Sequence, residues 1–195
     1  MSARRAAALL LGLGLLTSAC TAAGDADAGG APAAATTTWS APLQACPEQP
    51  DEPAAGPQTL PPVALPCPGG GELDLGRAPG VPTVVNLWAS WCAPCREELP
   101  LVQDLADAAA GRVAVVGVIS KDGVPQADSF ATDAGVTFPS AYDRGGELMD
   151  ELGVNVLPFT YLVDADGALV HTEVGPVASV DELRALVAEH LGVQL

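Results

Sequence analysis

Two cysteines, Cys92 and Cys95, stand three positions apart in the segment WCAPC and are the residues best suited to do chemistry. On the first turn of a helix this spacing brings the side chains to about 5 to 6 Å from each other, so a disulfide can form without rearrangement. Such a pair can open and close reversibly, which is thiol–disulfide exchange. The alternatives are a structural disulfide and a zinc site, but zinc needs two more ligands, and the sequence has no second closely spaced pair of Cys or His.

The place of the two cysteines relative to the predicted elements distinguishes their roles. Residues 84–89 form a β-branched and aromatic run that predicts a strand, and apolar residues at helical spacing after Arg96 predict a helix. Cys92 therefore lies where the helix begins, and there the free N–H groups and the helix dipole stabilise a thiolate. We expect a lowered pKa for Cys92, which makes it the nucleophile, and we assign Cys95, one turn deeper, as the resolving thiol.

The elements that must position these cysteines alternate between strands and helices, which predicts an α/β domain. Apolar periodicity and turn signals after the first strand and helix predict strand 113–119, helix 125–134, strand 138–141, helix 146–152, strand 159–163, strand 168–174 and helix 179–191. Because a final hairpin follows the alternating elements, we expect a central mixed β-sheet flanked by helices on both faces.

The N-terminal residues predict export from the cytoplasm. Arg4 and Arg5 precede an apolar run, residues 6–16, that is too short for a comfortable membrane span. Small residues then lead to Cys20 in a pattern that resembles a bacterial lipobox. We therefore expect residues 1–19 to be a signal peptide of the lipoprotein type and Cys20 to be the lipidated anchor that attaches the mature protein to the membrane. A cleaved secreted protein and an uncleaved anchor are the alternatives.

Two segments separate this signal from the main domain, residues 72–195. Residues 20–41 are small and polar without apolar periodicity, which predicts a disordered tether. Residues 42–71 are rich in Pro and Gly and have too few periodic apolar residues to fold alone. In an exported protein their cysteines, Cys46 and Cys67, are expected to form a structural disulfide, and a second redox pair is the alternative.

The charge of the chain limits its partners. The formal net charge is −16 at pH 7, which excludes nucleic acid as a natural partner. An acidic surface also avoids anionic lipid, so we expect the tether rather than the domain to hold the protein at the membrane. We expect no metal site and no cofactor, and we give His171 and His190 structural roles.

Two motifs together make the chain resemble the TlpA/ResA-like family of extracytoplasmic, membrane-tethered proteins. The segment NLWASWCAPCREELP, residues 86–100, has the family pattern of a strand, Trp-Cys-x-x-Cys and a glutamate, Glu98, three residues later. The segment VLPFTYLVD, residues 156–164, is similar to the segment that contains the cis-proline of the thioredoxin fold, here Pro158. The resemblance covers about residues 60–192 and implies a thioredoxin-like fold with the strand and helix that this family inserts.

The resemblance also implies a substrate-binding surface beside the cysteines. A cis bond between Leu157 and Pro158 would present the backbone of Leu157 to an extended substrate, and Trp91 would belong to the same surface. An ordinary trans proline at the start of a strand is the alternative.

An acid near the thiols is the third feature that the resemblance implies. Thioredoxin has a buried aspartate where this chain has Asn86, and an amide cannot accept the proton of Cys95. Glu98, one turn beyond Cys95, resembles the acidic residue with which the family tunes its thiols, and its carboxylate would raise the pKa of both cysteines. A glutamate on the helix surface is the alternative.

These residues predict a thiol:disulfide oxidoreductase. Because Ala93 and Pro94 between the cysteines are neutral and Glu98 is anionic, reduction of substrates is favoured over their oxidation. The family resemblance implies that electrons come from a membrane thiol carrier and that the substrates are disulfides of exported proteins such as apocytochrome c. An oxidative-folding protein is the first alternative. A peroxiredoxin-like peroxidase, which has Thr or Ser where this chain has Ala89, and a non-catalytic binding lipoprotein are the others.

Overall fold

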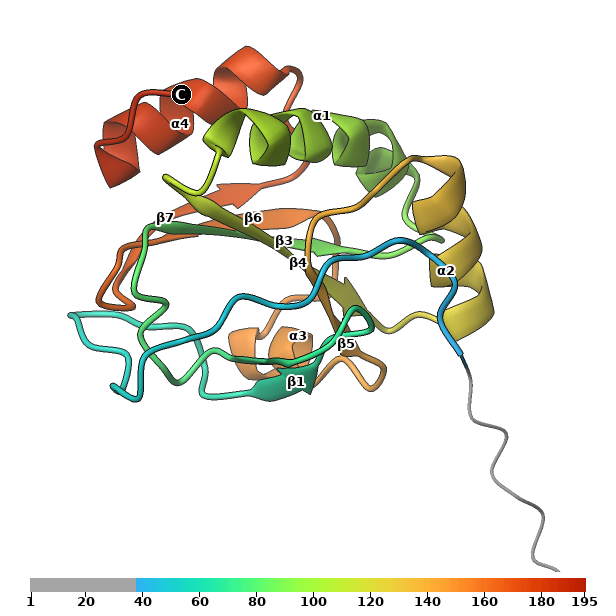
Figure 1. Cartoon of the computed structure of the whole chain (residues 1–195), viewed down its shortest axis with the longest axis horizontal. Coiled ribbons are helices and arrows are strands. Elements are labelled where there is room, and N and C mark those ends of the chain that lie inside the picture. Colours follow the sequence, from blue (N-terminus) through green and yellow to red (C-terminus); the bar gives the residue numbers. More distant parts are fainter. Residues whose placement is uncertain (1–37) are drawn as a thin grey trace, which may run out of the picture. The chain divides into compact units, whose positions relative to one another are not determined.

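The computed structural model describes residues 38–195, which contain a five-stranded mixed sheet (Figure 1). Its strands are β3 (Thr83–Trp88), β4 (Ala114–Ser120), β5 (Ser140–Asp143), β6 (Phe159–Val163) and β7 (Leu169–Val174). They lie in the order β5-β4-β3-β6-β7. β3 is parallel to β4 and β4 to β5, whereas β6 is antiparallel to both β3 and β7. Every residue of β3 is buried, which explains the nearly continuous apolar sequence of this central strand.

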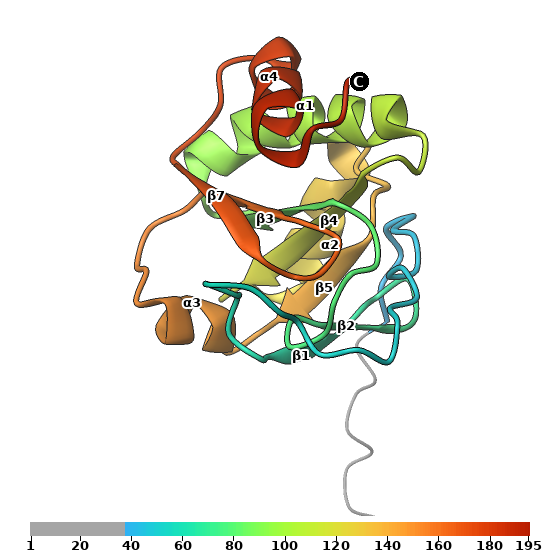
Figure 2. The same cartoon turned by 90° about the vertical axis from the view of Figure 1, so that its left-hand side faces the viewer.

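The helices that flank the sheet in the described residues are α1 (Ala93–Ala109), α2 (Val124–Asp133), α3 (Glu147–Leu152) and α4 (Val180–Leu191). Figures 1 and 2 show α1 and α4 side by side on one face of the sheet and α3 on the opposite face. The expected α/β fold, with a mixed sheet covered on both faces, is therefore confirmed. α2 and β5 lie between the cysteine segment and the proline segment, where the family resemblance implies an inserted helix and strand.

The Pro- and Gly-rich segment contains a short hairpin that the sequence analysis did not predict. β1 (Ala64–Pro66) pairs antiparallel with β2 (Glu72–Asp74), and the leucine at the centre of each strand is buried. Strands of three residues are too short to show an alternating pattern. Cys46 and Cys67 are joined by a disulfide with their Cα atoms 5.9 Å apart, and this bond ties the end of β1 to the preceding chain.

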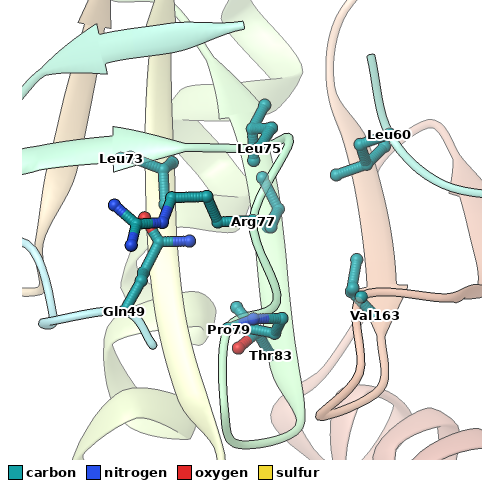
Figure 3. A pocket seen from close by; sticks show the side chains of 10 residues that line it. Gln49, Leu60, Leu73, Leu75, Arg77, Pro79, Thr83 and Val163 are labelled. Carbon is teal, nitrogen blue, oxygen red and sulfur yellow. The ribbon is translucent and has the colours of Figure 1, made fainter. Parts of the chain in front are cut away.

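A small apolar pocket lies between the segment around β2 and the sheet (Figure 3). Leu73 and Leu75 line one side, and Thr83 from the start of β3 and Val163 from the end of β6 line the other. Because the cysteine segment follows the opposite end of β3, this pocket is not part of the cysteine site.

Trp39 and the two residues after it contact the domain. Its ring packs edge-to-face on Tyr142, with the ring centroids 5.2 Å apart. The backbone N–H groups of Ser40 and Ala41 both donate to Asp128 on α2 at 2.7 Å. Residues 39–41, which the predicted tether includes, therefore have an aromatic partner and a carboxylate acceptor on the domain.

The predicted signal peptide, Cys20 and the rest of the tether lie outside the described residues. Within residues 38–195, no helix has both the length and the apolar composition that crossing a membrane requires.

Candidate active site

The two cysteines of the WCAPC segment lie at the start of α1. Cys92 is the N-cap residue, and its Sγ accepts a hydrogen bond from the backbone N–H of Cys95 at 3.2 Å. The two residues form a disulfide with their Cα atoms 5.3 Å apart. Cys92 keeps 4% of its surface exposed, whereas Cys95 is completely buried. Cys92 is therefore the more accessible of the two cysteines.

The environment of Cys92 favours a thiolate once the disulfide is reduced. N–H groups of the first helical turn have no partner within the helix, and the N–H of Cys95 already points at the Cys92 sulfur. Pro94 in the same turn lacks an N–H, so no additional unpaired donor is created there. The first turn of α1 contains no acidic residue that would offset the helix dipole.

Trp91 stands exposed beside Cys92 and borders a groove between α1 and α2. The residue is 57% exposed, and its indole N–H donates to the carbonyl oxygen of Lys121 at 3.0 Å, which holds the ring in place. In the same groove the guanidinium of Arg96 lies over the ring of Phe130, 5.0 Å from its centroid. Cys92 therefore lies next to an aromatic side chain that a hydrogen bond holds in place.

The bond between Leu157 and Pro158 is cis. The next residue, Phe159, pairs with Leu87 on β3. Pro158 therefore lies at the end of β3 from which the chain continues to Cys92, and the cysteine and proline segments meet at one end of the sheet.

Exposed apolar side chains gather at this end of the sheet. Trp91, Val156 and Val174 are each more than half exposed. Val156 directly precedes Leu157, and Val174 is the strand partner of Phe159. Large apolar side chains that are exposed in a group mark interaction surfaces.

Glu98 is buried between α1 and the sheet, with 1% of its surface exposed. Its Oε1 accepts a hydrogen bond from the backbone N–H of Val177 at 3.2 Å, and its Oε2 accepts one from Nδ2 of Asn86 at 3.1 Å. Burial raises the pKa of Glu98, the two hydrogen bonds offset part of this effect, and the carboxylates of Glu173 and Glu182 add to it. The alternative of a surface glutamate is therefore wrong, and Glu98 is a buried acid one turn beyond the second cysteine.

Asp122 is a residue of this site that the sequence analysis missed. It lies in the loop between β4 and α2, is 7% exposed, and accepts hydrogen bonds from the N–H and hydroxyl of Ser90 and from the N–H of Gly123. The hydroxyl of Tyr142 donates to its backbone carbonyl at 2.8 Å. An acidic residue two positions after the end of a buried strand is the signal that could have indicated it. Asp122 fixes the turn that leads into Cys92.

The two histidines lie together at the β7 edge of the sheet, on the face that α1 and α4 cover. His171 on β7 and His190 on α4 stack with their ring centroids 4.0 Å apart, and Nε2 of His171 lies 3.2 Å from Oε2 of Glu173. Among residues 38–195 there is no group of three or more Cys, His, Asp or Glu side chains that could hold a metal ion.

Comparison with known proteins identifies the family. Residues 54–187 match the family model described as Redoxin. The chain is 35% identical over 117 residues to a thiol:disulfide interchange protein DsbE homolog of Paracoccus denitrificans, a match that covers 60% of this chain and 63% of the relative. It is 31% identical over 104 residues to sporulation thiol-disulfide oxidoreductase A of Bacillus subtilis, which covers 51% of this chain and 63% of the relative. The matched region thus spans slightly less than two thirds of these curated relatives.

Solved structures share the fold. A secreted Mycobacterium tuberculosis disulfide oxidoreductase homologous to E. coli DsbE superimposes with a TM-score of 0.58 and 26% identity, covering 66% of this chain and 96% of that protein. StoA from Bacillus subtilis gives a TM-score of 0.55 and 28% identity, and the match covers 64% of this chain and 96% of StoA. The chain therefore belongs to the Redoxin family and, within it, to the TlpA/ResA-like group of thioredoxin-fold proteins.

Proposed function

We propose that this protein is a thiol:disulfide oxidoreductase whose reaction starts at Cys92. The observation that supports this most directly is the contrast between the two cysteines. Cys92, at a helix N-terminus, keeps a small exposed area, whereas Cys95 in the first turn of the same helix is completely buried. A thiolate in the first position can attack an external disulfide, whereas a buried second thiol can attack only the sulfur of the first.

In the reducing direction the Cys92 thiolate attacks one sulfur of a substrate disulfide. A mixed disulfide forms between Cys92 and the substrate, and the other substrate sulfur leaves as a thiolate that takes up a proton. Cys95 then gives its proton to the carboxylate of Glu98, attacks the Cys92 sulfur and releases the second substrate thiolate. Two electrons pass to the substrate, and the dithiol becomes the Cys92–Cys95 disulfide that the structure contains.

The exposed apolar surface around the cysteines supports an extended polypeptide as substrate. Such a chain would lie against the backbone of Leu157 and the ring of Pro158 and place apolar side chains on Trp91, Val156 and Val174. A folded substrate would bury its own apolar residues, so this surface fits an unfolded or partly unfolded protein better.

We further propose that the reaction runs toward reduction of exported proteins. Strong oxidants of this fold stabilise the reduced thiolate, and here Ala93 and Pro94 are neutral while the buried Glu98 adds an acid close to the thiols. By resemblance to the TlpA/ResA-like family, a membrane thiol carrier supplies the electrons and apocytochrome c is the candidate substrate. The signal peptide at residues 1–19, a lipidated Cys20 and the tether would keep the domain outside the cytoplasmic membrane.

The proposal is tested by trapping the mixed disulfide. In the full chain expressed in its host, Cys95→Ser should hold substrates on Cys92, and mass spectrometry should identify exported proteins with paired cysteines, apocytochromes among them. Cys92→Ser is the matched control and should hold none. Capture of many unrelated secreted proteins would contradict the reductive direction in favour of oxidative folding. Failure of the reduced wild-type protein to reduce insulin would contradict the oxidoreductase itself.

A further inference from the structure

A row of polar side chains crosses the face of the sheet that α1 and α4 cover. Asn86 on β3 pairs with Thr160 on β6, and Thr160 pairs with Glu173 on β7, so the three residues are in register across neighbouring strands. Side chains in register point to the same face of a sheet. Asn86 and Thr160 are completely buried, although apolar residues occupy most of this layer.

Hydrogen bonds connect one end of this row to the acid of the active site. Nδ2 of Asn86 donates to Oε2 of Glu98 at 3.1 Å and to Oγ1 of Thr160 at 2.9 Å. Thr160 is in turn the strand partner of Glu173 on β7. The row therefore leads away from Glu98 toward the edge strand β7.

The other end of the row reaches solvent. The side chain of Glu173 is 34% exposed, and its Oε2 is 3.2 Å from Nε2 of His171, which stacks on His190 of α4. Glu98, in contrast, is almost completely shielded from water. The buried carboxyl of Glu98 is thus followed, across the neighbouring strands, by two buried neutral polar side chains and then by the carboxylate of Glu173, which water can reach.

Charges from several elements act on Glu98. Asn86 on β3 and the N–H of Val177 donate hydrogen bonds to it, and the carboxylates of Glu173 on β7 and Glu182 on α4 add negative charge. The groups next to these are Thr160, which Asn86 also binds, His171 beside Glu173, and His190, which stacks on His171. Cys95 lies three residues before Glu98 on α1. Of the two carboxylates that raise the pKa of Glu98, Glu173 contributes more than Glu182. Glu173 is also the one that lies in the row.

We propose that Glu173 is a positioning residue of the redox site: from the open end of the row its carboxylate sets the protonation of Glu98, and with it the pH at which Cys95 becomes a nucleophile. This inference rests on the proposed function. A negative Glu173 makes Glu98 hold its proton more tightly and so makes it a stronger base toward Cys95. The contact with Nε2 of His171 holds one oxygen of Glu173.

The experiment follows the carboxyl carbon of Glu98 by NMR in the reduced full chain labelled at the glutamate side-chain carboxyl, with Glu98→Gln to assign the signal. We expect Glu173→Gln to lower the pH midpoint of Glu98 by roughly half a unit or more. In Glu173→Asp, which keeps the charge, the midpoint of Glu98 should return most of the way to its wild-type value. Glu147→Gln, on α3 at the opposite face, is the control and should leave the midpoint unchanged.

The kinetic readout is the pH profile of the resolving step, measured as release of a substrate peptide from the mixed disulfide. Its midpoint should move with that of Glu98 in Glu173→Gln and return in Glu173→Asp. An unchanged Glu98 midpoint in Glu173→Gln, in a variant that unfolds at the wild-type temperature, would overturn the inference. That result would leave the oxidoreductase intact, whereas a wild-type protein that reduces no disulfide would contradict the proposed function itself.

Discussion

Asp122 accepts two hydrogen bonds from Ser90, one from the backbone N–H at 2.5 Å and one from the hydroxyl at 3.0 Å. Ser90 lies two residues before Cys92, and its partner is in a loop more than thirty residues further along the chain. This contact joins the β4–α2 loop to the turn that places the nucleophile at the start of α1. Together with the bond from Trp91 to Lys121, it makes the loop a support for the active site.

Replacement of Asp122 by Ala should loosen this turn. Because the N–H and hydroxyl of Ser90 would lose a buried acceptor, we expect the free energy of unfolding to fall by about 1 to 3 kcal/mol. The second-order rate of disulfide reduction should fall as well, since Cys92 would no longer be held at the helix N-terminus. Urea unfolding and insulin reduction measure the two effects. Asp122→Asn keeps one acceptor, so its stability and its rate should lie between those of the wild type and those of Asp122→Ala. A wild-type rate in Asp122→Ala would refute the supporting role.

Glu98→Gln should slow the reaction and change the pH dependence of stability. The raised pKa of Glu98 means that the folded protein takes up a proton before the unfolded chain does as the pH falls. Burial of the charged Glu98 carboxylate therefore lowers the stability of the wild-type protein fully above the raised pKa, and this destabilisation disappears as the pH falls toward 4.5. We expect the variant to gain stability relative to wild type as the pH rises through this window, and disulfide reduction to slow by about tenfold or more.

Urea unfolding at several pH values measures the stability of both proteins. Glu97→Gln, at the exposed neighbouring position, is the matched control and should follow the wild type in both measurements. A constant difference in stability between Glu98→Gln and wild type over the whole pH range would contradict the buried charge.

Asp128→Asn should release the segment that begins at Trp39. Partial burial opposes ionisation of Asp128, but the hydrogen bonds from Ser40 and Ala41 outweigh it and lower the pKa. A lowered pKa means that the contribution to stability is present at neutral pH and is lost as the pH falls below about 4. We expect the amide hydrogens of Ser40 and Ala41 to exchange at least about fivefold faster in the variant at pH 7. Unchanged exchange would show that the carboxylate does not hold this segment; Asp133→Asn is the control.

The Cys46–Cys67 disulfide should contribute to stability and not to catalysis. It closes a loop with a sequence separation of 21 residues, for which chain entropy predicts about 3 kcal/mol. Cys46→Ser together with Cys67→Ser should lose stability of that order and keep the wild-type rate of insulin reduction. Loss of the rate in a folded double variant would instead support the second redox pair.

Most of the fold was predictable because its elements are long and periodic. The predicted strand 159–163 agrees with β6 at both ends, and helix 179–191 differs from α4 by one residue at its start. The β1–β2 hairpin was not predictable, since its strands show no period and it depends on Leu65 and Leu73 packing against the rest of the domain. The packing of Trp39 was not predictable either, because its partner on β5 is about a hundred residues away in sequence.

The site residues were predictable only where they belong to short sequence motifs. Cys92, Cys95 and the cis bond before Pro158 lie in such motifs. Asp122 and Glu173 do not: folding brings Asp122 to Ser90, and it puts Glu173, for which a role is proposed above, in register with Thr160. Residues of this kind look like ordinary surface carboxylates in the sequence.

The central claim is that the helix N-terminus makes Cys92 an acidic, reactive thiol, and its rate of alkylation against pH tests this most directly. In reduced Cys95→Ser, iodoacetamide should modify Cys92 with a midpoint at least about one pH unit below that of a free cysteine. In reduced Cys92→Ser, the buried Cys95 should react far more slowly at every pH. A Cys92 that titrates like an ordinary free thiol, or that reacts no faster than Cys95, would contradict the account.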